Sequence, residues 1–368
     1  MIPTKLGKKS HGEYMSHQII DFRSDNVTGI IPEILQAIIR ENDRYGDTSY
    51  GYDQTTIALE RQLRDFFDYP VQIFPIISGT AANALTLASI TPPYGAIFCH
   101  EHAHIHVHEC GAAEFFTGGA KLILLQGQQG KLAPDLLDQK IRTLGKGDRH
   151  SIQPAAISLT QATEWGAVYQ PNHVTEICKV AKKHDMLVHM DGARFANSLL
   201  ALRCHPGDIT WRAGVDVLCL GATKAGAMAA EVVVFFNPKP VENFGYRWQR
   251  SGHVLSKMRF LSCQLQAFWR KGLWDQHALQ ANRLAKSLAD GIRQIPSAQL
   301  VAEPDINEVF MRLPKHMITQ LQSQGVLFYD WPFPDPDHQE NLPIIRLVTS
   351  FATTQEMVDR FLGILKNI

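Results

Sequence analysis

Apolar residues recur along the chain with two periodicities, one typical of helices and one typical of strands. Amphipathic helices are predicted at residues 31–39 and 55–67, where apolar positions repeat every three to four residues. Short strand-like runs then alternate with helical segments, and these runs lie at residues 71–77, 96–99, 121–125, 155–160, 186–190, 215–220 and 232–236. The alternation predicts an α/β fold with a mostly parallel sheet covered by helices on both faces.

The pattern changes towards the C-terminus. One long helical stretch is predicted over residues 260–295, followed by mixed strands and helices that end with a strand at 344–349 and a closing helix. Such a mixture is typical of a smaller α+β domain. We therefore predict a flexible arm at residues 1–18, a large domain at 19–258, a small domain at 259–368 and a surface loop at 331–343.

Composition narrows the classes of function. The 368 residues carry a formal net charge of zero, which gives no support for nucleic-acid or membrane-surface binding. No apolar run reaches the ~18 residues of a membrane span, and the first 18 residues contain no signal-peptide core. The six cysteines include no Cys-x-x-Cys pair, which is typical of a reducing compartment. We expect a cytoplasmic protein.

Two ionisable residues follow separate buried strands. Asp191 ends one apolar run and opens the sequence Asp-Gly-Ala-Arg, while Lys224 follows a later run and is surrounded by small residues. Ligands of open α/β sheets collect at the carboxyl ends of strands. Pyridoxal 5′-phosphate (PLP) needs this pair, since a lysine forms its Schiff base and an acid keeps its pyridine nitrogen protonated. A helix-capping Asp191 and a surface-loop Lys224 are the open alternatives.

A third strand is followed by a turn that suits phosphate. Residues 78–83 read Ser-Gly-Thr-Ala-Ala-Asn and lead into an apolar helix. Backbone N–H groups at a helix start bind phosphate, and glycine permits close approach. An ordinary helix N-cap would look the same, so the turn supports a phosphorylated cofactor only together with Asp191 and Lys224.

Five histidines alternate between His100 and His108. On a strand they would share one face, whereas on a helix His104 would neighbour both ends of the run. Zinc binding is one interpretation, but no cysteine pair or His-Glu-x-x-His helix is present, and we expect no metal. The other interpretation is that one histidine stacks on a flat cofactor. A non-catalytic metal-binding protein built on this run is a competing hypothesis, which predicts zinc, nickel or copper in the purified protein and no yellow colour.

Several motifs, taken in order, resemble the low-specificity L-threonine aldolases, within the β-eliminating-lyase group of fold-type-I PLP enzymes. The matching segments are residues 21–28, 50–55, 191–194, the Lys224 strand and residues 346–349. The resemblance covers nearly the whole chain from Asp21. It implies a large domain with a mostly parallel seven-stranded sheet, a smaller C-terminal domain, and cleavage of L-threonine, L-allo-threonine or related β-hydroxy-α-amino acids, phenylserine among them, to glycine and an aldehyde.

The resemblance also implies roles for individual residues. Lys224 would carry the Schiff base, Asp191 would pair with the pyridine nitrogen, and His104 would stack on the ring. The residues expected to hold the phosphate are Gly79, Thr80, Ala81 and, from across a subunit interface, Arg259. The residues expected to bind the substrate are Ser24, Arg194 and Arg346 at its carboxylate, with Tyr50 as a further contact; Arg194 is also a candidate cofactor contact. A homodimer or homotetramer with shared active sites is implied.

One segment departs from the family pattern. Many relatives have an Asn-Thr-His-Asn-Gly-like stretch that supplies a second active-site histidine, and here Glu164 or Trp165 falls near its place. The catalytic base is therefore open among His104, another histidine of the run, Glu164 and a water held by one of them. A different PLP-dependent lyase, a racemase or an aminotransferase would use the same lysine and acid, so these reactions are the alternative.

Overall fold

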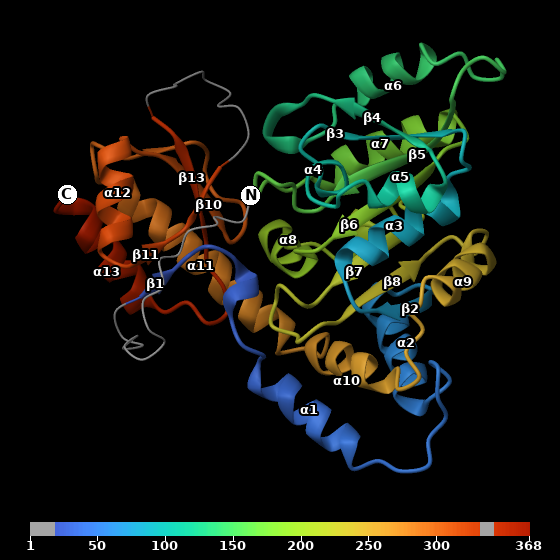
Figure 1. The fold of residues 1–368 in the computed structure, drawn as a ribbon, viewed down its shortest axis with the longest axis horizontal. Coiled ribbons are helices and arrows are strands. Elements are labelled where there is room, and N and C mark those ends of the chain that lie inside the picture. The colour runs from blue at the N-terminus through green and yellow to red at the C-terminus, as the bar shows by residue number, and fades with distance from the viewer. Residues whose placement is uncertain (1–18, 332–341) are drawn as a thin grey trace.

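The computed structural model describes residues 19–331 and 342–368. The arm expected at residues 1–18 lies outside the described residues, as does nearly all of the loop expected at 331–343. Two domains lie side by side, and helix α11 (Trp274–Ile292) runs from the larger one into the smaller one (Figure 1).

A seven-stranded sheet forms the centre of the large domain (Figure 1). Its spatial order is β2 (Gln72–Ile76), β8 (Glu231–Phe235), β7 (Val217–Gly221), β6 (Leu187–Gly192), β5 (Gln153–Thr160), β3 (Gly95–His100) and β4 (Lys121–Leu125). Strand β8 is antiparallel to both of its neighbours, and the other adjacent pairs are parallel. The prediction of a mostly parallel seven-stranded sheet is confirmed.

Helices cover both faces of this sheet, because its central strands are apolar on both sides. The large domain contains α1 (Pro32–Asn42), α2 (Gln54–Phe67), α3 (Gly79–Ile90), α4 (His104–Val107), α5 (Ala112–Thr117), α6 (Pro134–Arg142), α7 (Pro171–Lys183), α8 (Phe195–Leu202), α9 (Val241–Arg250) and α10 (Arg259–Phe268). Separate apolar clusters form, one including Leu159 and Leu218 and the other Ile97 and Val217. Alternate residues of each strand thus pack into opposite layers.

The small domain has its own hydrophobic core. Its four-stranded antiparallel sheet has the order β12 (Tyr329–Asp330), β13 (Ile344–Val348), β10 (Glu308–Arg312) and β9 (Gln299–Leu300). Helices α12 (Lys315–Ser323) and α13 (Gln355–Lys366) complete it, and β11 (Val326–Leu327) pairs in parallel with the N-terminal β1 (Ile20–Asp21). The segment at Ile20–Phe22 therefore belongs to the small domain's core, although the residues that follow it from α1 onwards belong to the large domain.

The single helix expected at residues 260–295 is wrong. Helix α10 ends at Phe268 and α11 begins at Trp274, with Gly272 between them at φ +93, in the left-handed region. The apolar spacing continues through the break because Trp269 and Trp274 both pack on Phe66.

The hydrophobic cores of the two domains meet within α11, since Ala278 belongs to the core of the large domain and Leu284 to that of the small domain. The boundary expected at 258/259 stays a prediction.

Within the two described ranges, none of the helices combines the length and the apolar character needed to cross a bilayer.

Candidate active site

Lys224 and Asp191 line the same cavity, which has a volume of about 220 Å³. Asp191 lies near the carboxyl end of β6, and Lys224 follows the carboxyl end of the adjacent strand β7. The parallel pairing of β6 with β7 brings the two strand ends to one edge, as the sequence pattern predicted. The acid and the amine are therefore placed to act on one bound molecule.

Hydrogen bonds fix the Asp191 carboxylate. Its Oδ1 accepts the backbone N–H of Ala193 at 3.0 Å, and its Oδ2 accepts from Asn83 Nδ2 at 3.0 Å. Asn83 lies on α3 and also donates to Glu109 Oε1 at 2.9 Å. Asn83 and Glu109 were not identified from the sequence, although Asn83 ends the turn motif that was.

His104 borders the cavity and is held by a buried acid. Its Nδ1 lies 2.8 Å from Glu109 Oε1. Burial alone would lower the pKa of His104, but the bond to Glu109 raises it overall; burial raises the pKa of Glu109. The histidine run is neither one strand nor one helix, because β3 ends at His100 and α4 begins at His104. His104 and His108 still meet on α4, with ring centroids 5.5 Å apart.

The N-terminus of α3 reaches the cavity through Gly79 and Thr80. Ser78 caps this helix, because its side chain accepts the Ala81 N–H at 3.3 Å. A Cβ added at Gly79 would meet no atom within 4 Å, so the turn presents open space in front of backbone N–H groups. Gly79 and Thr80 are thus placed to bind an anion, whereas the Ala81 N–H already has a partner.

The arginines expected to bind a carboxylate lie in one buried ionic cluster. Arg194 directs Nε to Asp25 Oδ2 at 2.8 Å and Nη2 to Asp25 Oδ1 at 3.2 Å. Its Nη1 lies 3.3 Å from Glu308 Oε2, and Arg346 Nη1 lies 3.5 Å from Glu308 Oε1. Asp25 and Glu308 were missed by the sequence reasoning. The available signal for Glu308 was a charged residue directly before the apolar run Val309–Met311.

Ser24 connects this ionic cluster to the cavity. Its hydroxyl accepts the Asn26 N–H at 3.1 Å and caps the short helix at Asp25–Val27. Asn26 lines the cavity while Asp25 holds Arg194. The segment Ser24–Val27 thus lies between the Lys224 cavity and the ionic cluster of Arg194 and Arg346.

Glu164 and Trp165 lie in the turn that follows β5. Glu164 borders a smaller neighbouring cavity with His102, and its charge contributes to raising the pKa of His104. Trp165 donates from Nε1 to His102 Nδ1 at 2.9 Å and packs against Phe310 of the small domain. Glu164 and Trp165 both fall near the position where many relatives have a second active-site histidine. Of these two residues, Glu164 is the one whose charge acts on His104.

A further acid, Glu231, borders the cavity but was not anticipated. It pairs with Gly221 at the start of β8 and is only 8% exposed. Burial raises its pKa to about 7, although Thr223 and the charge of Lys224 lower it. The available signal was the same as for Glu308, because Glu231 is the charged residue that opens the apolar strand β8.

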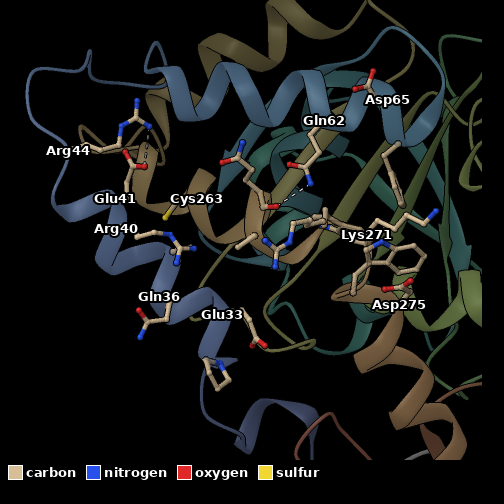
Figure 2. A pocket seen from close by; sticks show the side chains of 18 residues that line it. Glu33, Gln36, Arg40, Glu41, Arg44, Gln62, Asp65, Cys263, Lys271 and Asp275 are labelled. Carbon is tan, nitrogen blue, oxygen red and sulfur yellow. Dashed lines mark hydrogen bonds and ion pairs between the residues drawn. The ribbon is translucent and has the colours of Figure 1, made fainter.

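Arg259 and Tyr50 lie elsewhere, beyond the described lining of the Lys224 cavity. Arg259 begins α10, with Nε 3.5 Å from Glu41 Oε1, and Tyr50 is 53% exposed in a segment that hydrogen-bonds to Ser256. Glu41 also lines a separate groove of about 1100 Å³ between α1, α2 and α10 (Figure 2). Within one chain, therefore, the structure does not bring Arg259 or Tyr50 to the site.

The residues of the Lys224 cavity fit PLP. They combine a lysine amine, an acid held in place, a helix N-terminus open to an anion and a flat imidazole. The buried Asn83 Oδ1 has no hydrogen-bond partner among the described residues, so the cavity also offers an acceptor to a bound group. No group of three metal-ligating side chains occurs in residues 19–331 and 342–368.

Known proteins resemble this chain over most of its length. The model of the family described as β-eliminating lyase matches residues 21–316. The chain is 38% identical over 315 residues to the low specificity L-threonine aldolase of Pseudomonas sp. (strain NCIMB 10558), covering 86% of this chain and 90% of that protein. It is 39% identical to the protein of the same name from Pseudomonas aeruginosa, with the same coverage. The solved structure of Leishmania major threonine aldolase has a TM-score of 0.87 at 25% identity, covering 94% of this chain and 98% of that one.

The chain therefore belongs to the β-eliminating lyase family, which confirms the expectation of a fold-type-I, PLP-dependent lyase. Within that family its similarity is to proteins named low specificity L-threonine aldolases, the group that the sequence motifs indicated.

Proposed function

We propose that the protein cleaves L-threonine, L-allo-threonine or related β-hydroxy-α-amino acids, phenylserine among them, to glycine and an aldehyde. The observation that carries this proposal is the placing of Lys224 and Asp191 on one cavity, beside His104 and the open start of α3. The similarity to proteins named as L-threonine aldolases over 86% of the chain supports it.

Each part of the cavity would hold one part of PLP. Lys224 would bind its aldehyde carbon, Asp191 would hold its pyridine nitrogen, and His104 would lie against its ring. Gly79 and Thr80 would bind its phosphate through the N-terminus of α3. When bound, PLP supplies an electron sink that stabilises the negative charge left when a bond to the substrate's Cα breaks.

The arginine cluster would orient the substrate. Arg346 and Arg194, with Ser24, would hold the carboxylate and so decide which bond to Cα stands perpendicular to the ring, the position from which it breaks most easily. Arg194 is already engaged by Asp25 and Glu308. Arg346 Nε has no hydrogen-bond acceptor among the described residues, so we expect Arg346 to make the stronger contact with the carboxylate.

The β-hydroxyl of the substrate must lose its proton for an aldehyde to leave. His104 is placed to accept it at Nε2, because Nδ1 faces Glu109. Glu164, or a water held by Glu164 or His104, is the other candidate. Glu109 would keep the imidazole ring in one orientation.

Replacing His104 by asparagine is expected to lower kcat by roughly 10²-fold or more if His104 is the base. Steady-state kinetics with L-threonine measures the loss, and the visible spectrum shows how much cofactor each variant retains. His150→Asn is the matched control, because His150 is exposed and lies outside the His100–His108 run. Full activity of His104→Asn would remove His104 from this role and favour Glu164.

We also propose a homodimer or homotetramer with shared active sites. Helix α1 leaves Leu35 44% and Ile39 48% exposed, as expected of a face that meets another subunit. Arg259 and Tyr50, which lie away from their own chain's cavity, would then contact the cavity of a partner chain.

We also propose a cytoplasmic location, which is supported by the six cysteines, all of them unpaired.

Co-expression of Lys224→Ala with Arg259→Ala tests the shared site. Each variant alone is expected to be nearly inactive. Their mixture should recover about a quarter of wild-type activity, because about half of randomly assembled dimers are mixed and each has one intact site. A mixture as inactive as its parents would mean that Arg259 serves its own chain.

The reaction itself is tested with purified protein. A visible absorbance band that changes on addition of glycine would establish the cofactor and its reaction at Cα. Release of acetaldehyde from L-threonine, or benzaldehyde from phenylserine, supports the aldolase. Pyruvate-type products would indicate a β-eliminating reaction, inversion of the amino acid a racemase, and exchange with an oxo acid an aminotransferase.

A further inference from the structure

Glu308 is a buried acid shared by two arginines from different domains. Its side chain is fully buried, with Oε2 3.3 Å from Arg194 Nη1 and Oε1 3.5 Å from Arg346 Nη1. Arg194 precedes α8 of the large domain, while Glu308 and Arg346 lie on the adjacent strands β10 and β13. Glu308 therefore occupies a position between the two guanidinium groups that are proposed to hold the substrate carboxylate.

The charges of this cluster are balanced without any ligand. Arg194 and Arg346 contribute two positive charges, and Asp25 and Glu308 contribute two negative charges when ionised. The turn after β5 packs directly on the acid, because a Cβ added at Gly166 would lie 3.0 Å from Glu308 Cβ. The Glu308 side chain is fully buried, so water does not screen its charge, and a further carboxylate brought here would leave an excess negative charge.

The groups that face Glu308 come from four segments. Burial raises its pKa most, Arg194 and Arg346 lower it, the charges of Glu164 and Asp25 raise it further, and the net direction is upward. A substrate carboxylate bound to the same arginines would also raise the pKa of Glu308, as the charges of Glu164 and Asp25 do. Glu308 is thus the acid of this cluster that is best placed to become neutral.

We propose that Glu308 stands in for the substrate carboxylate in the ligand-free protein and takes up one proton from solvent when that carboxylate arrives. Within the cluster the arginines exchange one negative partner for another, and the O–H bond that Glu308 forms with a proton from solvent is the only covalent change. This inference rests on the proposed function, since it takes Arg194 and Arg346 to be the carboxylate site.

The test measures glycine binding to the cofactor-loaded protein by the change in visible absorbance across a range of pH. Wild-type affinity is expected to rise as pH falls through the pKa of Glu308, and Glu308→Gln should lack this component. At alkaline pH, Glu308→Gln should bind glycine about 10-fold more tightly than wild type for each pKa unit by which the ligand raises the pKa of Glu308. Ethylamine, which lacks a carboxylate, should bind with equal affinity to wild type and to Glu308→Gln.

Calorimetry in two buffers of different ionisation enthalpy counts the protons directly. Wild type should take up more protons per glycine bound than Glu308→Gln, by an amount approaching one. Glu303→Gln is the matched control, because Glu303 lies on the surface, pairs with Arg293 and should behave as wild type. Glu308→Asp keeps the acid in a shorter side chain and should keep the proton uptake, which protects the test if the glutamine variant folds poorly.

Equal proton uptake and equal pH dependence in wild type and a folded Glu308→Gln would overturn the proposal. Weaker glycine binding in that variant would also overturn it, because Glu308 would then only hold the arginines in place. If glycine changes the spectrum of no protein, wild type included, the proposed function fails and this inference fails with it.

Discussion

Lys224→Ala is expected to abolish the visible band of the lysine-bound cofactor and to reduce kcat on the order of 10⁶-fold, the size of loss seen when a covalent catalytic group is removed. Lys224 supplies the only lysine amine among the described residues that line the cavity. Without that amine the cofactor loses its covalent attachment, and the substrate amine has no lysine to displace. Absorbance spectra and steady-state kinetics measure both effects.

Two further variants separate the loss of the covalent bond to the cofactor from the loss of the positive charge of Lys224. Lys224→Arg keeps a positive charge near Asp25 and Glu231, whose pKa values Lys224 helps to lower, but cannot form the same bond. It should be as inactive as the alanine variant while staying closer to wild type in thermal stability. Lys239→Ala changes an exposed lysine and should keep both band and activity. A visible band that survives in Lys224→Ala would mean that another lysine carries the cofactor.

The part of the site that was predicted from sequence depends on local patterns. Asp191 and Lys224 each follow a continuous apolar run, and such runs are strands of a sheet whose neighbours are mostly parallel. One rule, that carboxyl ends of parallel strands share an edge, was then enough to place the acid beside the amine. The turn at residues 78–83 was indicated by a different rule, that backbone N–H groups at a helix start bind phosphate, and the family resemblance then singled out Gly79 and Thr80.

The ionic cluster could not be predicted in this way. Arg194 is held by Asp25, 169 positions away, and Asp25 also accepts from Asn307, 282 positions away. Periodicity says which face of an element is buried but not which distant elements meet. Family resemblance indicated Arg194 and Arg346, whereas their acidic partners became apparent only from the packing of the small domain on the large one.

The break between α10 and α11 shows a second limit. Residues 269–273 keep the apolar spacing of a helix, so periodicity alone extends one helix across them. Helix α10 already ends at Phe268, and Gly272 in the left-handed conformation keeps one continuous helix from running through to α11. A single glycine in a helical pattern is common enough that it did not outweigh the surrounding apolar residues.

Asp191→Asn is expected to lower kcat by about 10²- to 10⁴-fold while leaving the cofactor bound. The change preserves the shape of the side chain, and an amide oxygen can still accept the Ala193 N–H that now bonds to Oδ1. It removes the negative charge that would keep the pyridine nitrogen protonated, so the ring withdraws electrons less strongly from Cα. Kinetics with L-threonine gives the loss, and the visible spectrum before substrate addition shows that the cofactor remains.

Asp216→Asn is the matched control for that experiment. Asp216 is also a largely buried acid next to β7, where it accepts the Val188 N–H at 2.8 Å and an amide proton from Asn237, but it precedes the strand and so lies at the opposite edge of the sheet. Its replacement should reduce stability and leave kcat nearly unchanged. If Asp191→Asn matched that behaviour, the carboxylate would only fix the loop at Ala193, and the chemistry at Cα would not depend on a protonated pyridine ring.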